Sequence, residues 1–248
     1  MVNSYNAIAL SINLNKVALL RNQRDVGYPS VTAAAATCIA AGADGITVHP
    51  RPDQRHMRIS DVHELAQMLT VEFNIEGNPE DDFLSLVQQV RPAQCTLVPD
   101  TPAQRTSDHG WDIATRGGFL RDVVALLHAQ GTRVALFMDA DPVAIRAARE
   151  TGADRVELYT EAYASAYGTD AESSVLATYV ESAQAALDVG FEINAGHDLS
   201  LINLPSFVAA VPGLQEVSIG HAFVADALWH GFDATVAAYK CALQRAQT

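Results

Sequence analysis

Short apolar runs alternate with longer amphipathic segments along the whole chain of 248 residues. The short runs are rich in Val, Ile, Leu and Phe, which favour strands, and we predict eight strands from them. They lie at residues 7–13, 46–48, 71–76, 94–99, 132–140, 154–159, 191–196 and 216–221. The longer segments predict helices over residues 31–41, 60–68, 79–90, 117–130, 142–151, 173–189, 203–211 and 223–245.

Eight strands that alternate with eight helices are typical of a closed (β/α)8 barrel. The chain length fits one such domain, so we predict an α/β fold with a single (β/α)8 TIM barrel over residues 1–248. An open doubly wound sheet is the alternative. No GxGxxG motif follows the first strand, which weakens a dinucleotide-binding fold.

Local signals suggest where two of the helices begin and which connections stay irregular. Ser30 can cap the helix that follows it, and Ser60 can open the next helix. We expect the segment that contains Arg21 and Arg24 to form a loop, and residues 160–172 to form a polar, Tyr-rich insertion.

Charge and composition narrow the classes of partner. The formal net charge of −13 argues against nucleic acids and anionic membranes, since both bind basic surfaces. No apolar run approaches the length of a membrane-spanning helix, and the N-terminal residues lack a secretion signal. Cys38, Cys95 and Cys241 lie far apart without metal-binding spacing and are typical of reduced core thiols. We therefore expect a cytoplasmic protein that binds small molecules.

Polar side chains gather where the predicted strands stop, whereas the strand interiors read as apolar. The carboxyl ends carry Asn13, His49, Glu76, Asp139, Glu157, Asn194 with His197, and Gly220 with His221. In a barrel all these ends open on one face, so residues that are distant in sequence converge there. The pattern predicts one active-site cavity.

Three of these residues are candidates for acid–base chemistry. His49 can exchange protons near neutral pH, although a loop histidine bonded to backbone is the alternative. Burial would raise the pKa of Glu76 and make it a usable base, unless it forms an ion pair with an arginine. Glu157 lies within its strand; if it faces inward, its charge must be paired or must stabilise cationic intermediates.

The last two strands carry candidates for phosphate binding. Gly196 precedes His197 in the sequence NAGHD, and Gly220 precedes His221 in SIGH. Backbone amides near the seventh and eighth strands are the usual phosphate receptor of this fold, so Gly220 is a candidate. Two arginine pairs are further candidates: Arg21 with Arg24, and Arg51 with Arg55.

A metal site is the competing interpretation of the same cluster. His49, Glu76, Glu157 and His197 could form a nitrogen and oxygen ligand set. No HxH or HExxH spacing is present, however, so we favour acid–base use and predict no metal.

The motifs together resemble the pyridoxine 5′-phosphate synthase family. The similar segments are SINLNKVALLRNQR, GADGITVHPRPDQRH, FNIEGN, TLVPD, ELYT, NAGHDL and SIGHA, and they extend over nearly the whole chain. The resemblance implies a (β/α)8 barrel with extra helices and a homo-oligomer, typically an octamer built as a tetramer of dimers. It also implies condensation of 3-amino-2-oxopropyl phosphate with 1-deoxy-D-xylulose 5-phosphate, without a cofactor. The products would be pyridoxine 5′-phosphate, inorganic phosphate and water.

The resemblance also implies roles for individual residues. His49, Glu76 and His197 match the proton-transfer residues, and Glu157 matches the residue that stabilises charged intermediates. The residues that match substrate-binding positions are Asn13, Asn15, Lys16, Arg24, Arg51, His56, Thr106, Asp198, Gly220 and His221. The chain departs from the common pattern at three of them: Asn15-Lys16 replaces Asp-His, and Asp198 lies where Gly is frequent.

Two other functions remain open at this point. The chain could be another phospho-sugar isomerase or aldolase on the same barrel, with help from a metal ion. It could also be a non-catalytic paralogue that only binds sugar phosphates. Residues 99–112 and 160–172 are long enough to close over a ligand in either case.

Overall fold

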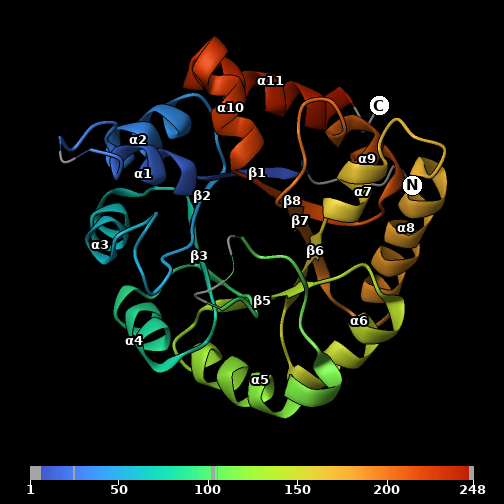
Figure 1. The fold of residues 1–248 in the computed structure, drawn as a ribbon. Coiled ribbons are helices and arrows are strands. Elements are labelled where there is room, and N and C mark those ends of the chain that lie inside the picture. The colour runs from blue at the N-terminus through green and yellow to red at the C-terminus, as the bar shows by residue number, and fades with distance from the viewer. Residues whose placement is uncertain (1–6, 25, 102–103, 105, 246–248) are drawn as a thin grey trace.

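A closed barrel of eight parallel strands forms the centre of the protein (Figure 1). The structure is a computed structural model that describes residues 7–24, 26–101, 104 and 106–245. The strands are β1 (Ala9–Asn13), β2 (Gly45–Val48), β3 (Glu72–Gly77), β4 (Gln94–Leu97), β5 (Arg133–Met138), β6 (Arg155–Tyr159), β7 (Glu192–Gly196) and β8 (Leu214–Ile219). Each strand pairs with the next, and β8 pairs with β1 to close the barrel. The predicted barrel is confirmed.

Helices surround the barrel on all sides (Figure 1). They are α1 (Asn15–Arg21), α2 (Val31–Ala40), α3 (Ile59–Met68), α4 (Asp81–Val90), α5 (Ile113–His128), α6 (Pro142–Ala148), α7 (Glu161–Ala166), α8 (Glu172–Asp188), α9 (Leu204–Ala210), α10 (His221–His230) and α11 (Phe232–Arg245). A short 3-10 helix, η1 (Arg149–Thr151), follows α6. Among the described residues, no helix combines the length and apolar character needed to cross a membrane.

Two helices lie where the sequence predicted irregular chain. Helix α1 replaces part of the predicted loop, because Val17 and Ala18 bury one of its faces against the core. Helix α7 occupies the first half of the predicted insertion and buries Tyr163, whose hydroxyl donates a hydrogen bond to the Asn203 carbonyl. Short helices of this kind depend on packing more than on their own propensity, which makes them hard to predict.

The predicted helix starts were right once and wrong once. The Ser30 side chain accepts a hydrogen bond from the Ala33 backbone N–H, as an N-cap does. Helix α3, however, begins one residue before Ser60. Its first turn is held by the Asp61 carboxylate, which accepts from the Arg58 N–H at 2.8 Å.

The predicted C-terminal helix over residues 223–245 is two helices. Helix α10 begins earlier, at His221, and ends at His230. Gly231 then adopts a φ of +81°, which an L-residue with a side chain reaches only at a cost, and α11 starts in a new direction. The early start of α10 brings its first turn next to the end of β8.

The two faces of the barrel strands differ in chemistry. One face packs against the helices and is apolar, with Leu10, Ile12, Ile46 and Ile75 fully buried. Since side chains alternate along a strand, the other face points into the barrel.

The interior face is polar, which corrects the prediction of apolar strand interiors. The Ser11 and Thr47 hydroxyls lie 2.7 Å apart, and the Thr96 hydroxyl donates to the Asn74 side chain at 3.1 Å. These buried polar groups satisfy one another, as buried polar groups must if they are not to destabilise the fold. A chain of side-chain hydrogen bonds therefore runs across β1, β2, β3 and β4 inside the barrel.

Charged side chains fill the barrel at the amino ends of the strands. Arg155 is central: it donates to the Glu192 carboxylate at 2.6 Å and to the Glu216 carboxylate at 3.1 Å. Burial and the nearby Glu72 raise the pKa of Glu216 to about 8, while Arg155 acts in the opposite direction. These paired charges fill the end of the barrel that lies away from the predicted site.

Candidate active site

A cavity of about 390 Å³ opens at the carboxyl ends of the strands. Its lining residues are Asn13, Asn15, Lys16, His49, Arg51, His56, Glu76, Val98, Thr106, Ser107, Phe137, Glu157, His197, Asp198, Ser218, Gly220, His221 and Ala222. Of the residues that match catalytic and substrate-binding positions of the family, all except Arg24 line this cavity. The placement agrees with the general rule that barrel enzymes act at this face.

His49 lies between two carboxyl groups on one side of the cavity. Its Nδ1 is 3.8 Å from Glu76 Oε2, and its Nε2 is 3.3 Å from Asp100 Oδ2. All three side chains are buried. The histidine follows β2 directly, and the Asn15 side chain accepts a hydrogen bond from its backbone N–H at 2.9 Å. The imidazole is therefore anchored through its backbone and has an acid or base on each side.

Glu76 and Asp100 differ in their preference for a proton. Burial raises the pKa of Glu76 well above its usual range, and the nearby Glu157 and Asp100 add to the shift. A hydrogen bond from Asn13 Nδ2, at 3.3 Å, opposes it. The hydrogen bond and charge of His49, together with Arg51, instead lower the pKa of Asp100, although its burial acts in the opposite direction. Glu76 is thus the proton-holding group, and Asp100 stays ionised.

Arg51 connects this side of the cavity to the loop after β4. It pairs with Asp100 and donates to the carbonyls of Thr101 and Gln104 at 3.2 and 3.0 Å. The guanidinium is buried, and that burial is the first cause of the lowered pKa of Arg51. Arg51 therefore helps to hold the loop after β4 in place, in addition to any contact with substrate.

His197 lies across the cavity, directly after β7. Its φ of +79° is unusual for a residue with a side chain, and such strain collects at functional sites. Its Nε2 is 2.8 Å from the Thr106 hydroxyl, and its Nδ1 is 2.7 Å from Asp198 Oδ2. The ring packs edge-on against Tyr159 with centroids 5.2 Å apart. The position and plane of the imidazole are therefore defined from several directions.

Glu157 faces into the barrel beneath the cavity, which resolves the open question of its orientation. The side chain is buried, and the Thr96 hydroxyl lies 3.5 Å from its carboxylate. Burial raises the pKa of Glu157 to about 7, while the nearby His197 and the bond from Thr96 act in the opposite direction. Since no cation pairs with it directly among the described contacts, a positively charged ligand could stabilise its ionised form.

Two cationic side chains, Lys16 and Arg51, line the cavity together with the imidazole of His56. Burial lowers the pKa of His56 to about 4, and Lys16 and the arginines reinforce the shift. The imidazole is therefore neutral at physiological pH and can either donate or accept a hydrogen bond.

The N-terminus of α10 forms another wall. Gly220 and His221 lie at the cavity, and the first backbone N–H groups of a helix have no partners within the helix. A side chain at position 220 would place its Cβ 3.1 Å from Asn13 Cβ, so glycine allows β1 and α10 to approach closely. Free amides and the helix dipole favour an anion at this wall.

Arg21 and Arg24 do not behave as predicted phosphate receptors. Arg21 is buried and forms a paired contact with Asp61, with its Nη2 at 2.8 Å from Oδ2. This ion pair joins the last turn of α1 to the first turn of α3, and it directs the guanidinium to a carboxylate of the protein itself. Arg24 is exposed and lies outside the cavity lining, so its predicted contact with substrate has no support within one chain.

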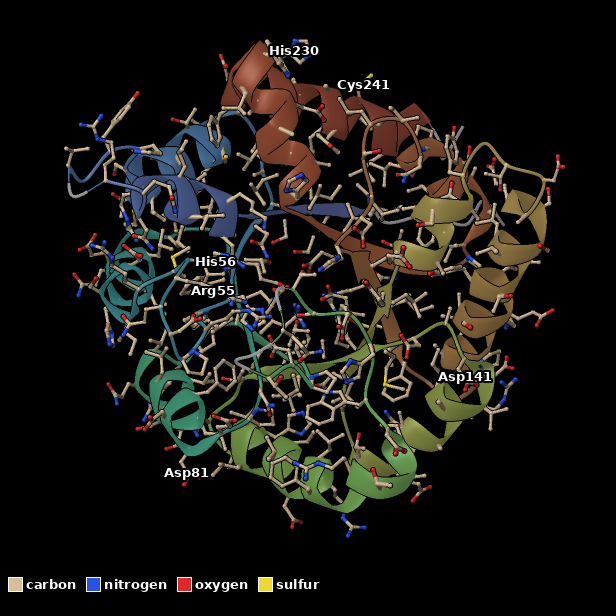
Figure 2. All side chains as sticks on the ribbon, viewed as in Figure 1. Arg55, His56, Asp81, Asp141, His230 and Cys241 are labelled. Atoms are coloured by element: carbon tan, nitrogen blue, oxygen red, sulfur yellow. The ribbon has the colours of Figure 1, made fainter. Side chains whose placement is uncertain are left out.

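The rest of the candidates separate clearly by position. Figure 2 shows Arg55 and His56 on the inner side of the ring of helices. Asp139 is exposed and does not line the cavity, and Asn194 lies deeper in the barrel, where it accepts from Arg155.

Several residues at the site were missed by the sequence reasoning. Asp100 is the most important, because it contacts both His49 and Arg51. It follows the fourth strand, so the strand-end pattern could have found it. The others are Val98, Ser107, Phe137, Ser218 and Ala222. Among the described residues, no group of three or more His, Cys, Asp or Glu side chains is arranged to hold a metal ion.

Comparisons with known proteins find one family over nearly the whole chain. The family model described as "Pyridoxal phosphate biosynthesis protein PdxJ" matches residues 10–245. A pyridoxine 5′-phosphate synthase of Albidiferax ferrireducens is 55% identical over 245 residues, covering 95% of this chain and 97% of the relative. One from Bacteroides thetaiotaomicron is 51% identical over 235 residues, covering 95% and 99% of the two chains.

Solved structures with low sequence identity share the fold. The 3-keto-L-gulonate-6-phosphate decarboxylase from Vibrio cholerae superposes with a TM-score of 0.66 at 11% identity, over 97% of this chain and 99% of that one. At this identity the similarity concerns the barrel alone.

Proposed function

The chain belongs to the PdxJ family of pyridoxal phosphate biosynthesis proteins, and we propose that it is a pyridoxine 5′-phosphate synthase. It joins 3-amino-2-oxopropyl phosphate to 1-deoxy-D-xylulose 5-phosphate and releases inorganic phosphate and water. The observation that supports this proposal best is that His49, Glu76 and His197 line one cavity, together with Lys16, Arg51 and the N-terminus of α10.

The reaction needs this number of acids and bases. An amine that condenses with a ketone must lose protons, and the carbonyl oxygen must gain protons to leave as water. Loss of phosphate and closure of an aromatic ring require further proton removal from carbon. One residue cannot carry all of these transfers, so several groups around one cavity suit the chemistry.

His49 and Glu76 form the first proton-transfer centre in this proposal. They lie side by side, and Glu76 holds its proton more tightly than an ordinary carboxyl group does. His197 forms the second centre on the opposite wall. Two centres allow protons to be removed and delivered on different faces of the bound substrates.

Glu157 is suited to stabilise cationic intermediates. Condensation of an amine with a ketone passes through a protonated imine, and a nearby carboxylate favours that charge. With a pKa of about 7, Glu157 is partly ionised in the resting site, and a cation in the cavity would draw out the remaining proton.

Both substrates carry phosphate, and the cavity has two walls that suit phosphate. The N-terminal turn of α10, at Gly220 and His221, offers backbone N–H groups. Lys16, Arg51 and His56 offer side-chain donors, together with Asn13, Asn15 and Thr106. We assign one phosphate-bearing substrate to each wall.

Turnover with both substrates tests the proposal. We expect the purified chain to form pyridoxine 5′-phosphate and inorganic phosphate in equal amounts, measured by chromatography and by a phosphate assay. Tight binding of the substrates without any phosphate release would instead support the non-catalytic paralogue. Conversion of a single sugar phosphate, lost on treatment with a chelator, would support the isomerase or aldolase.

We further propose that the chain assembles into a homo-octamer in the cytoplasm. Membership of the family supports the assembly, and the free cysteines Cys38, Cys95 and Cys241 support a reducing compartment. Light scattering on the purified protein should give the mass of eight chains, and a monomeric mass would contradict the assembly.

A further inference from the structure

We propose that Asp198 is a positioning residue that holds His197 in a single tautomer, and that it is not a substrate ligand. This inference deepens the proposed function and rests on it, because His197 is assigned there as a proton-transfer group. The resemblance to the family implies a substrate contact for Asp198, whereas its contact with His197 supports a different role.

The contact between the two side chains defines the tautomer. Asp198 Oδ2 lies 2.7 Å from His197 Nδ1, which is a hydrogen-bond distance. An ionised carboxylate can only accept a hydrogen bond, so Nδ1 must carry the hydrogen. In the neutral ring Nε2 then carries no hydrogen and keeps its lone pair. The contact of Asp198 with Nδ1 therefore sets the tautomer of the whole ring.

The opposite side of the ring agrees with this assignment. Nε2 lies 2.8 Å from the Thr106 hydroxyl, which can donate to a lone pair. Thr106 also lines the cavity, so Nε2 is the nitrogen next to the substrates. Asp198 thus contacts Nδ1, and Nε2 is the nitrogen that transfers protons in the proposed reaction.

Backbone geometry fixes Asp198 in this position. Its N–H donates to the Gly196 carbonyl and to the Thr160 hydroxyl, both at 3.2 Å. The Thr160 hydroxyl in turn donates to the Gly196 carbonyl. Asn203 Nδ2 donates to the Asp198 carbonyl at 3.2 Å. The tight turn after β7 therefore presents the carboxylate to the imidazole.

Rotation of the imidazole away from Asp198 is opposed by its aromatic neighbours. The ring lies edge-on to Tyr159 and is tilted against Phe137, with a centroid distance of 6.3 Å to the latter. Asp198 and its partner His197 are each about one third exposed or less, at 34% and 27% of the side-chain surface. The pair is thus partly protected from water, which strengthens the contact relative to a surface pair.

Kinetics of Asp198→Asn separate positioning from substrate binding. We expect kcat to fall by about 10- to 100-fold, less than the ~10⁴-fold loss known for a fully buried Asp–His pair, because Asp198 is partly exposed. The KM for each substrate should stay within about twofold. A raised KM with unchanged kcat would show a direct ligand and overturn the proposal, as would unchanged values of both constants.

The tautomer of His197 provides a readout that does not depend on turnover. Histidine-selective ¹⁵N labelling at pH 9, where an imidazole is ordinarily neutral, distinguishes protonated from unprotonated ring nitrogens. The His197 signals are assigned by their loss in His197→Asn. We expect hydrogen on Nδ1 in the parent protein and a shift toward hydrogen on Nε2 in Asp198→Asn and Asp198→Ala.

A matched control is available on the outer surface. Asp188→Asn on α8 removes the same charge from an exposed pair with Arg146, and it should change neither the kinetics nor the tautomer. The same His197 tautomer in the parent protein and both Asp198 variants would overturn the proposal. Because no substrate is present in this measurement, its result stands apart from that of the proposed function, which fails if the parent protein forms no pyridoxine 5′-phosphate.

Discussion

Replacing Glu76 with Gln should lower kcat by about 10²- to 10⁴-fold, the usual contribution of a general acid or base. Glu76 is buried, has a raised pKa and lies next to His49. Glutamine has the same shape and can still accept the hydrogen bond from Asn13, but it can neither release nor take up a proton. Steady-state rates of pyridoxine 5′-phosphate formation measure the loss.

The control for this experiment is the same change at an exposed site. Glu64→Gln on α3 should leave kcat unchanged, since that side chain lies in solvent. His49→Asn should show a loss of the same order as Glu76→Gln, because the two groups work together. Unchanged rates in both site variants would remove the first proton-transfer centre from the mechanism.

Glu157→Gln should make the protein more stable at pH 8 while it abolishes most of the activity. The folded state raises the pKa of this carboxyl group from an ordinary value near 4.5 to about 7. The folded state therefore binds the proton more tightly than the unfolded state does. As pH rises from about 4.5 to 7, the parent protein loses stability, and above pH 7 the loss is complete.

The size of this effect follows from the shift in pKa. A change from 4.5 to about 7 corresponds to roughly 3 kcal/mol of unfolding free energy at pH 8. Glutamine carries no charge at any pH and removes this penalty. Urea unfolding should therefore show a gain of up to about 3 kcal/mol at pH 8 and almost none near pH 4.5.

The opposite result would have a clear meaning. If Glu157→Gln is less stable than the parent at pH 8, the ionised carboxylate is well solvated or paired in the fold, and its role toward cationic intermediates loses its basis. The surface variant Glu64→Gln should show no difference between the two pH values. Such a trade between stability and turnover is common at active sites.

The barrel was predictable because its signal repeats along the chain. Each strand and helix pair carries its own periodicity, so an error in one element leaves the total pattern intact. Helix α1 was missed because its residues gain stability only by packing Val17 and Ala18 against the core. The break at Gly231 was missed because a single glycine is tolerated inside many helices.

The polar interior of the barrel was harder to predict from the strand sequences than the barrel itself. Both faces of a barrel strand are buried, so burial alone does not say which residues point inward. Ser11, Thr47 and Asn74 lie among apolar residues in the sequence and read as minor interruptions. Only closure of the barrel brings them into contact.

The candidate site was predictable where a residue directly follows a strand. His49 and His197 have this position, and the barrel geometry places them in the cavity. Asp100 directly follows the predicted strand over residues 94–99, although β4 itself ends at Leu97, and it was read as part of a polar loop. Arg21 was misjudged because its partner Asp61 lies forty residues further along the chain, on another helix.

The left-handed backbone at His197 has a consequence for protein engineering. Libraries screened only for heat resistance should accumulate Gly or Asn there, since these residues adopt that conformation with less steric conflict. Libraries screened for vitamin production should keep histidine. Position 197 would then lose histidine under selection for heat resistance and keep it under selection for activity.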